Sequence, residues 1–443
     1  MINKILPGAV AASLLSMALS ATVNADAGLD QRVGEIYDDQ LGELFLWFHQ
    51  NPELSMMEQK TSARLAQELE ALGYEVHTGI GKTGVVALLK NGDGPLVMFR
   101  ADMDGLPVQE KSGLPYASTA RQVDFAGNEV SVMHACGHDV HVTSLVGTAR
   151  LMAEAKDQWQ GTLMLIGQPA EERVLGAAAM REDGVWEKFG TPDYAMAFHV
   201  TSMVPTGMIV ADPAPYSGAD TVDINIKGVG AHGASPHRGV DPVLLGSEIV
   251  LALQSVVSRN LPPRRPGVIT VGSFHAGTKH NIISDGAKLQ LTVRSESRAD
   301  RQLLLDGIKR VAENMGRVAG LPEDMLPEVV VLDESVPPTL NDKDMLSRMR
   351  TVWAKDLGEG VFFEEERLGM GAEDFPFFTV GPDIPSVYFA VGGTPPEDFE
   401  REAQGGTPVP SHHSPLFKIT PEPAVEMGVK ASVSALMDLM KKS

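Results

Sequence analysis

The chain has 443 residues, of which 43% are hydrophobic and 21% are charged. This composition is typical of a globular protein and excludes a mostly disordered or collagen-like chain, while the length predicts two domains or one large domain with an insertion. The 58 acidic residues outnumber the 37 basic ones, and the net charge of −21 repels phosphate backbones, which argues against a nucleic-acid-binding protein. The only cysteine, Cys136, excludes an intrachain disulfide.

The first 25 residues have the pattern of a secretory signal peptide. Lys4 precedes an apolar run over 10–19, and Val23-Asn24-Ala25 fits a small-x-small cleavage site. The run is too short to span a bilayer comfortably, so an uncleaved anchor is the less favoured alternative. We expect a mature protein that is free of the membrane and lies in the periplasm or outside the cell. In that oxidising compartment a lone thiol is a liability unless it is buried or binds a metal.

Strands and helices alternate through the first half of the mature chain. Apolar residues at helical spacing predict helices over 57–72 and 140–153. Short apolar runs predict strands over 85–89, 96–99, 162–166 and 194–198. This alternation predicts an α/β domain with a mostly parallel sheet covered by helices.

The pattern changes at about Gly218 and changes back at about residue 335. Between these points the sequence predicts the order βαββαβ, which is the ferredoxin-like arrangement; its elements are 221–226, 242–259, 268–274, 289–294, 300–319 and 328–332. A helix over 345–353, a strand over 386–390 and a helix from about 422 resume the first pattern. We therefore predict a large α/β domain in two parts, 26–218 and 335–443, interrupted by a small domain over 219–334.

Residues able to bind metal follow or precede the predicted strands and helices of the large domain. They occur in Arg100–Pro107, in His134–His141, in Gln168–Glu172 and at His199. Because the carboxyl ends of the strands form the ligand crevice of an open α/β sheet, we expect these clusters to meet at one edge. Taken alone, Cys136 and His138 favour a buried thiol beside an ordinary histidine, but four clusters at one edge favour a divalent metal such as Zn²⁺.

Two pairs of neighbouring residues leave alternatives open. In Glu171-Glu172 one carboxylate can bind metal while the other faces a metal-activated water, although a solvated acidic pair has the same sequence. Near the end of the chain, His413 is a candidate ligand that closes the site, and spacing does not separate it from His412.

Seven motifs in order resemble the binuclear metal-dependent aminoacylase/carboxypeptidase superfamily. They are WFHQNPELS (47–55), RADMDGLP (100–107), MHACGHDVH (133–141), GQPAEE (167–172), AFHV (197–200), GMGAEDF (369–375) and HHSP (412–415). The chain is most similar to the amidohydrolase branch, which includes hippurate hydrolases, N-acyl-amino-acid amidohydrolases and indoleacetyl-amino-acid hydrolases. The resemblance implies a catalytic α/β domain with an inserted ferredoxin-like lid that often forms the dimer interface.

The resemblance also implies roles for residues of the large domain. The positions that hold two metal ions are matched by Cys136, His138, Glu172, His199 and His413. Glu171 matches the general base, and Asp104 matches a carboxylate that orients a ligand histidine. Asp102 stands where other branches carry a histidine ligand, so we interpret it as a neighbour of the ligands.

The lid supplies further candidates by the same resemblance. His232 matches a histidine that donates to the oxyanion of the tetrahedral intermediate, and this donation can come from across a dimer. Asn281 and Arg294 match residues that grip the carboxylate of the substrate. The ordinary interpretation, as loop or core histidines, holds for His237, His275 and His280. The chain departs from its relatives at Arg173-Val174-Leu175, where they are usually rich in glycine, and this leaves the acyl preference open.

The sequence therefore predicts a secreted amidohydrolase that cleaves N-acyl amino acids with two divalent ions, Zn²⁺ or Mn²⁺ before Co²⁺ or Ni²⁺. A carboxypeptidase or dipeptidase with the same metal chemistry is the first alternative, and a non-catalytic metal- or amino-acid-binding protein is the second. The expected partners are a small N-acyl amino acid or short peptide and a second copy of the chain, bound through the lid. No nucleic acid is expected to bind, and no membrane after signal cleavage.

Overall fold

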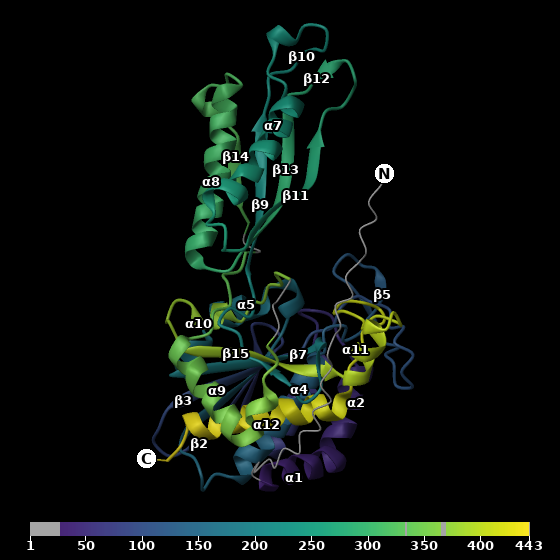
Figure 1. Ribbon diagram of the computed structural model, residues 1–443, viewed down its shortest axis with the longest axis vertical. Helices are drawn as coiled ribbons and strands as arrows, with labels where there is room; N and C mark the ends of the chain where they lie inside the picture. The colour runs from purple at the N-terminus through teal and green to yellow at the C-terminus, as the bar shows by residue number, and fades with distance from the viewer. Residues whose placement is uncertain (1–26, 333–334, 365–368, 443) are drawn as a thin grey trace, which may run out of the picture.

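The computed structural model describes residues 27–332, 335–364 and 369–442, and the predicted signal peptide lies outside them. Two bodies are visible, a large domain and a narrow domain that projects from it (Figure 1). Each is built on its own sheet.

The large domain contains a seven-stranded sheet in the order β1-β2-β6-β3-β7-β15-β8. In that order the strands are Glu75–Ile80, Gly84–Asn91, Gly161–Gln168, Leu96–Asp102, Tyr194–Pro205, Ser386–Thr394 and Ile209–Val210. The four central strands β6, β3, β7 and β15 are parallel, as predicted, and the flanking strands β1, β2 and β8 pair antiparallel. The centre is covered on both faces, which explains why the first four residues of β3, Leu96 to Phe99, form a continuous apolar run rather than an alternating one.

Helices cover both faces of this sheet. One face packs against α1 (Ala27–Ile36), α2 (Gly42–Gln50), α3 (Gln59–Ala71), α4 (His138–Glu154), α9 (Lys343–Leu357) and α12 (Pro421–Leu439). The other face packs against the shorter α5 (Gly176–Glu182), α6 (Val185–Phe189) and α10 (Pro376–Thr379). Each face of the sheet has its own apolar core, and alternate residues of β3 point into one or the other. Val97 and Phe99 pack in the first core, and Met98 packs in the second.

Several helices and strands of the large domain have no counterpart in the sequence prediction. Besides β1, β8, α5, α6 and α10, they include α1 with α2, the exposed hairpin of β4 (Arg121–Val123) and β5 (Glu129–Ser131), and α11 (Pro396–Ala403). The strands of the hairpin are only three residues long, too short for an alternating pattern to be recognised.

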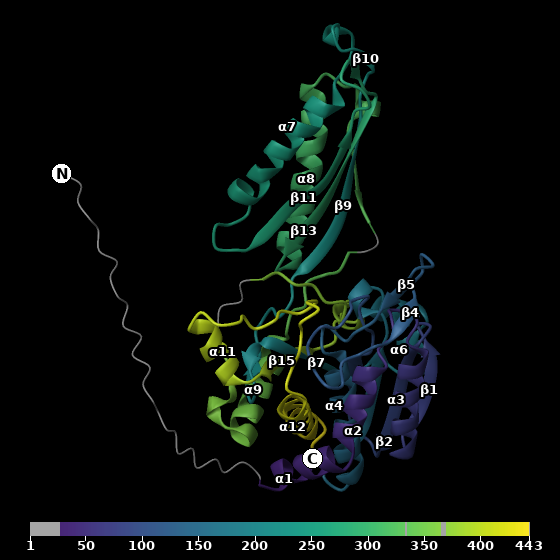
Figure 2. The ribbon, with the colours of Figure 1, turned by 90° about the vertical axis from the view of Figure 1, so that its right-hand side faces the viewer.

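The small domain, which we call the lid, has a four-stranded antiparallel sheet in the order β11-β13-β9-β14. These strands are Gly267–Ala276, Gly286–Ser295, Gly218–Lys227 and Glu328–Val331, and the helices are α7 (Pro242–Ser255) and α8 (Arg298–Val318). Both helices lie on one face of the sheet and enclose a separate apolar core (Figure 2). This is the βαββαβ order that the sequence predicts. A short pair, β10 (Ala231–His232) with β12 (Ile282–Ile283), forms the tip farthest from the large domain (Figure 1).

Candidate active site

The polar clusters of the large domain meet in a cleft between the two domains. Its volume is about 660 Å³, and the large domain contributes Cys136, Glu171, Glu172, His199 and His413 to its lining. The lid contributes Ala219, Thr221, Thr292 and Arg294 from the adjacent ends of β9 and β13. The cleft therefore lies at the carboxyl edge of the parallel strands, as predicted, with the lid as its second wall.

A sharp turn at Gly137 positions the first two donors. Gly137 has a φ of 86°, and a Cβ at this position would lie 2.3 Å from a side-chain carbon of Val200, so only glycine fits. The turn ends one residue before His138, which begins α4. As a result, Cys136 and His138 converge from an irregular turn rather than from a shared helical face.

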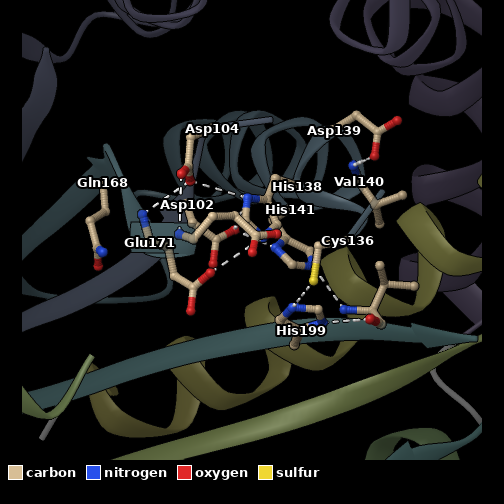
Figure 3. A network of polar contacts seen from close by, with 12 residues as sticks. Asp102, Asp104, Cys136, His138, Asp139, Val140, His141, Gln168, Glu171 and His199 are labelled. Atoms are coloured by element: carbon tan, nitrogen blue, oxygen red, sulfur yellow. Dashed lines mark hydrogen bonds and ion pairs between the residues drawn. The ribbon is translucent and has the colours of Figure 1, made fainter. Parts of the chain in front are cut away.

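The five predicted donors form two groups that share Cys136. Donor atoms of Cys136, His138 and His199 lie within 4.8 Å of one another, and so do those of Cys136, Glu172 and His413. The Cys136 sulfur is 3.5 Å from His199 Nε2 (Figure 3). Glu172 Oε2 is 3.2 Å from His413 Nε2. A thiolate common to both groups suits a pair of neighbouring ions.

Buried polar atoms without partners show that the site fits divalent metal. Among the described residues, both ring nitrogens of His138 and Glu172 Oε1 are buried and have no hydrogen-bond partner, whereas such atoms are normally paired. Burial lowers the pKa of His138, but the charges of Asp102 and Asp104 outweigh it and raise that pKa to about 10. Burial and the carboxylate of Glu172 raise the pKa of the Cys136 thiol well above its usual value. This concentration of donors and negative charge is what a bound cation would satisfy.

Asp104 holds the turn that carries the two glutamates. Its Oδ1 and Oδ2 accept the backbone N–H groups of Glu171 and Glu172, each at 3.1 Å, and Oδ1 lies 3.4 Å from His138 Nδ1. The residues on either side of the turn, Ala170 and Val174, have φ values of 49° and 57°, which are costly for residues other than glycine. Asp104 thus lies where it can orient His138, the predicted ligand, and it also stabilises a strained turn.

Glu171 is buried at the edge of the donor groups. Its Oε2 is 3.8 Å from His138 Nε2 (Figure 3). Burial, together with the carboxylates of Glu373, Glu172 and Asp374, raises the pKa of Glu171 well above its usual value. A carboxylate in this environment accepts a proton readily, which is the property that a general base needs.

Asp102 turns away from the cleft into a buried network. It accepts a hydrogen bond from Arg100 Nη1 at 2.6 Å and pairs with His141, whose Nε2 accepts the backbone N–H of Val200 at 2.8 Å. Asp102 therefore lies next to the predicted ligands, as we interpret it from the sequence. Through His141 it also holds β7 in place beside His199.

The same buried network includes Arg100 and its partners after the lid, which the sequence analysis did not predict. The Arg100 guanidinium is fully buried and lies 2.7 Å from Glu373 and 3.4 Å from Asp374, while the Tyr388 hydroxyl donates to Glu373 at 2.7 Å. The only available signal was an arginine inside an apolar strand together with the carboxylates of GMGAEDF. A buried arginine needs carboxylate partners, but the sequence does not say which ones.

The lid candidates are not brought together within one chain. Arg294 lines the cleft, whereas His232 and Asn281 lie at the tip, where Gly233 N–H donates to the Asn281 carbonyl. Strand β13 separates the two places, and its stretch from Gly286 to Arg294 spans about 27 Å at the usual rise per residue. Any joint action of these residues on one substrate needs a second copy of the chain.

The remaining histidines separate into two classes. His412 lies beside Cys136 and also lines the cleft, so the structure places both members of the His412-His413 pair at the site. By contrast, His237, His275 and His280 are exposed on the lid, in line with their ordinary interpretation.

Comparison with known proteins agrees with this geometry. The model of peptidase family M20/M25/M40 matches residues 98–413. The hippurate hydrolase of Campylobacter jejuni is 37% identical over 74% of this chain and 82% of its own length, and thermostable carboxypeptidase 2 of Saccharolobus solfataricus is 34% identical over 83% and 87%. The crystal structure of the YXEP protein of Bacillus subtilis, a dinuclear metal binding peptidase from the M20 family, superposes with a TM-score of 0.74 at 28% identity, over 92% of this chain and 99% of that one. The chain belongs to peptidase family M20/M25/M40 and is a metal-dependent amidohydrolase.

Proposed function

We propose that the chain hydrolyses the amide bond of N-acyl amino acids, with Glu171 as the general base. The observation that supports this best is the pair of donor groups sharing Cys136, placed next to a buried glutamate and facing an arginine across the cleft. The mixture of sulfur, nitrogen and oxygen donors accepts several divalent ions, and we propose Zn²⁺ or Mn²⁺ before Co²⁺ or Ni²⁺.

Each residue of the site has a separate role in the proposed hydrolysis. Cys136, His138, Glu172, His199 and His413 would hold two divalent ions, which would lower the pKa of a water toward ~7 and polarise the acyl carbonyl. Glu171 takes the proton of the attacking water and then passes it to the nitrogen of the leaving amine. The proton removed from the water thus ends on the amine product. Arg294 pairs with the carboxylate of the amino-acid half, for which its planar guanidinium is well suited.

Replacement of Glu171 by glutamine tests this assignment. We expect turnover of N-acyl amino acids to fall by about 10²–10⁴-fold, since glutamine cannot accept the proton, while the metal content stays unchanged. Glu187→Gln, on the exposed surface of α6, is the matched control. Near-normal turnover by Glu171→Gln would remove Glu171 from the mechanism.

A carboxypeptidase or dipeptidase activity is the second candidate, because the Saccharolobus carboxypeptidase is nearly as similar as the hippurate hydrolase. The two candidates differ in the group on the acyl side of the scissile bond. A panel of benzoylated and acetylated amino acids and unmodified dipeptides, assayed on metal-reconstituted protein, separates them. Faster cleavage of the dipeptides would favour the peptidase.

We also propose that the protein forms a homodimer through the lid. Strand β11 is at the edge of its sheet, and apolar residues of α7 and β11, among them Leu244, Leu251 and Phe274, are 59%, 74% and 38% exposed. The stretch Pro242–Asn260 is long and apolar enough to cross a membrane by composition, but its inner side packs in the lid core, so only its outer side is free. A second lid covering this face would give the tip residues His232 and Asn281 access to a cleft. Light scattering of the unsubstituted protein and of Leu251→Asp tests the proposed dimer. We expect a dimer for the unsubstituted protein and a monomer for the variant.

We also propose that the protein is exported and acts outside the cytoplasm. The apolar run and cleavage pattern of the first 25 residues support export to the periplasm or the medium. Fractionation of cells that express the full chain, followed by sequencing of the mature N-terminus, tests both export and cleavage. Retention of the uncleaved chain in the cytoplasm would refute it.

A further inference from the structure

We propose that His412 is a positioning residue that donates an N–H···S hydrogen bond to the Cys136 thiolate and does not itself bind metal. Its Nδ1 is 3.5 Å from the Cys136 sulfur. The imidazole is held in place by Phe417 on one side and His199 on another, with ring centroids 4.9 and 5.4 Å away. The ring is therefore fixed in an orientation that aims one nitrogen at the sulfur.

The backbone identifies which nitrogen of His412 carries the proton. Two groups face His412 Nε2: the Ser202 N–H at 3.3 Å and the Thr201 hydroxyl at 3.4 Å. The hydroxyl can donate or accept, whereas a backbone N–H can only donate. Nε2 must accept, so the single proton of the neutral imidazole resides on Nδ1, the atom that faces Cys136. A protonated nitrogen has no lone pair for a metal, so His412 is a donor to the thiolate.

His199, on another side of the same sulfur, has the opposite tautomer. Its Nδ1 pairs with the carbonyl oxygen of Val200, which can only accept, so Nδ1 carries the proton and Nε2 has a free lone pair. That lone pair lies 3.5 Å from the Cys136 sulfur. Once Cys136 is ionised, the lone pairs of its sulfur and of His199 Nε2 face each other, and a cation between them would satisfy both. An N–H and a thiolate, by contrast, attract each other directly. The backbone thus assigns a ligand role to His199 and a hydrogen-bonding role to His412.

The same reasoning resolves the His412-His413 pair. His413 Nε2 lies 3.2 Å from Glu172 within the second donor group, while His412 stands outside both groups. A hydrogen bond to the sulfur draws electron density away from it and fixes its direction toward the ions, as partners of metal ligands do elsewhere. This inference rests on the proposed two-ion site.

Two variants of His412 provide a matched test. The amide nitrogen of His412→Asn falls near the place of Nδ1 and keeps a donor to Cys136. The amide of His412→Gln reaches the place of Nε2, where it can pair with Ser202 but leaves the sulfur without a donor. Since asparagine is the smaller replacement, a role limited to packing would harm His412→Asn at least as much as His412→Gln.

The readouts use Co²⁺ as the probe and do not depend on activity. In the Co²⁺-loaded protein we expect a thiolate-to-cobalt charge-transfer band in the near ultraviolet. We expect this band to move to lower energy in His412→Gln and to stay in place in His412→Asn, because loss of the hydrogen bond raises the energy of the sulfur lone pairs. Competition with a chelator should show Co²⁺ bound about 10–100-fold more weakly by His412→Gln than by His412→Asn.

Three outcomes would overturn the proposal. An unchanged band and affinity in His412→Gln would mean that no hydrogen bond acts on the sulfur. Loss of one cobalt ion from both variants would mean that His412 is a ligand. Absence of a thiolate band in the unsubstituted protein would remove both this proposal and the two-ion site beneath it, which distinguishes that failure from the other two.

Discussion

Replacement of Asp104 by asparagine should weaken metal binding although it removes none of the five predicted ligands. The Asp104 carboxylate accepts the backbone N–H groups of Glu171 and Glu172, each at 3.1 Å, and the Ser55 hydroxyl at 2.6 Å. In asparagine one of the two oxygens becomes an amide nitrogen that can only donate. At least one of the two backbone N–H groups would then face another donor, and the turn would lose a charge-assisted hydrogen bond.

The size of the effect follows from the strain in that turn. A hydrogen bond to a charged group contributes about 1.5–3 kcal/mol, and each positive φ at Ala170 and Val174 costs about 1–3 kcal/mol. Without Asp104 the metal-free turn relaxes, and metal binding must restore the strained conformation. If the lost bond of about 1.5–3 kcal/mol appears in full, the affinity for metal falls by about 10–100-fold, since 1.4 kcal/mol corresponds to tenfold.

Competition with a chromophoric chelator measures this change directly. Ser55→Ala is the control, because it removes one donor to Asp104 but leaves both oxygens available to the turn. We expect its metal affinity to stay close to that of the unsubstituted protein. If Asp104→Asn bound metal as tightly as the unsubstituted protein does, the strain in the turn would not be held by Asp104, and the argument would fail.

Three further predictions concern the rest of the molecule. Burial lowers the pKa of His49, but its hydrogen bonds to Asp139 and Glu110 outweigh this and raise it to about 9 from the ordinary 6.5; its stabilising effect is therefore complete below about pH 6.5 and lost as the pH rises through 9. Urea titrations give the difference in unfolding free energy between the unsubstituted protein and His49→Gln. As the pH rises from about 6.5 to 9, this difference should shrink by about 3 kcal/mol. A constant difference would contradict the raised pKa of His49. Arg100→Met leaves three carboxylates buried without a cation and should lower the unfolding free energy by about 3–5 kcal/mol, compared with little change for the surface variant Arg150→Met. Arg294→Leu should raise KM for N-acyl amino acids about 10–100-fold with a smaller effect on amides that lack the carboxylate, and equal effects on both would argue against carboxylate binding.

The long helices and strands of the lid were predictable because the sequence of each has one clear period and a clear end. The alternation in VDINI predicts a strand over 221–226, and the structure has β9 at Gly218–Lys227. The long amphipathic pattern over 300–319 corresponds to α8 at Arg298–Val318, whose start is marked by the capping side chain of Ser297. In contrast, β8, β10 and β12 have two residues each, and no periodicity exists over two residues.

The convergence of the metal donors was predictable for a similar reason. Glu172 follows the parallel strand β6, His199 lies in the parallel strand β7, and Cys136 and His138 stand at the start of α4, while parallel strands end at one edge. His413 lies in the loop between α11 and α12, and strand order alone did not place it. The contacts of Arg100 were not predictable, because its partner Glu373 follows the inserted domain and only the fold brings the two together. The orientation of His412 likewise depends on a backbone N–H of Ser202, on a strand far away in the sequence.

The way the lid is attached has a consequence for how the protein is assembled. The chain leaves and re-enters the large domain through neighbouring segments, since Ala219 pairs with Val336 and Tyr216 with Thr339. A lid that folds first on its own core joins these ends and removes most of the entropic cost of closing so long a loop. In the folded molecule α12, which follows the lid, packs against α4 and α9, and His413 lies beside Cys136. The set of five predicted donors is therefore complete only when the part of the chain after the lid has packed onto the part before it.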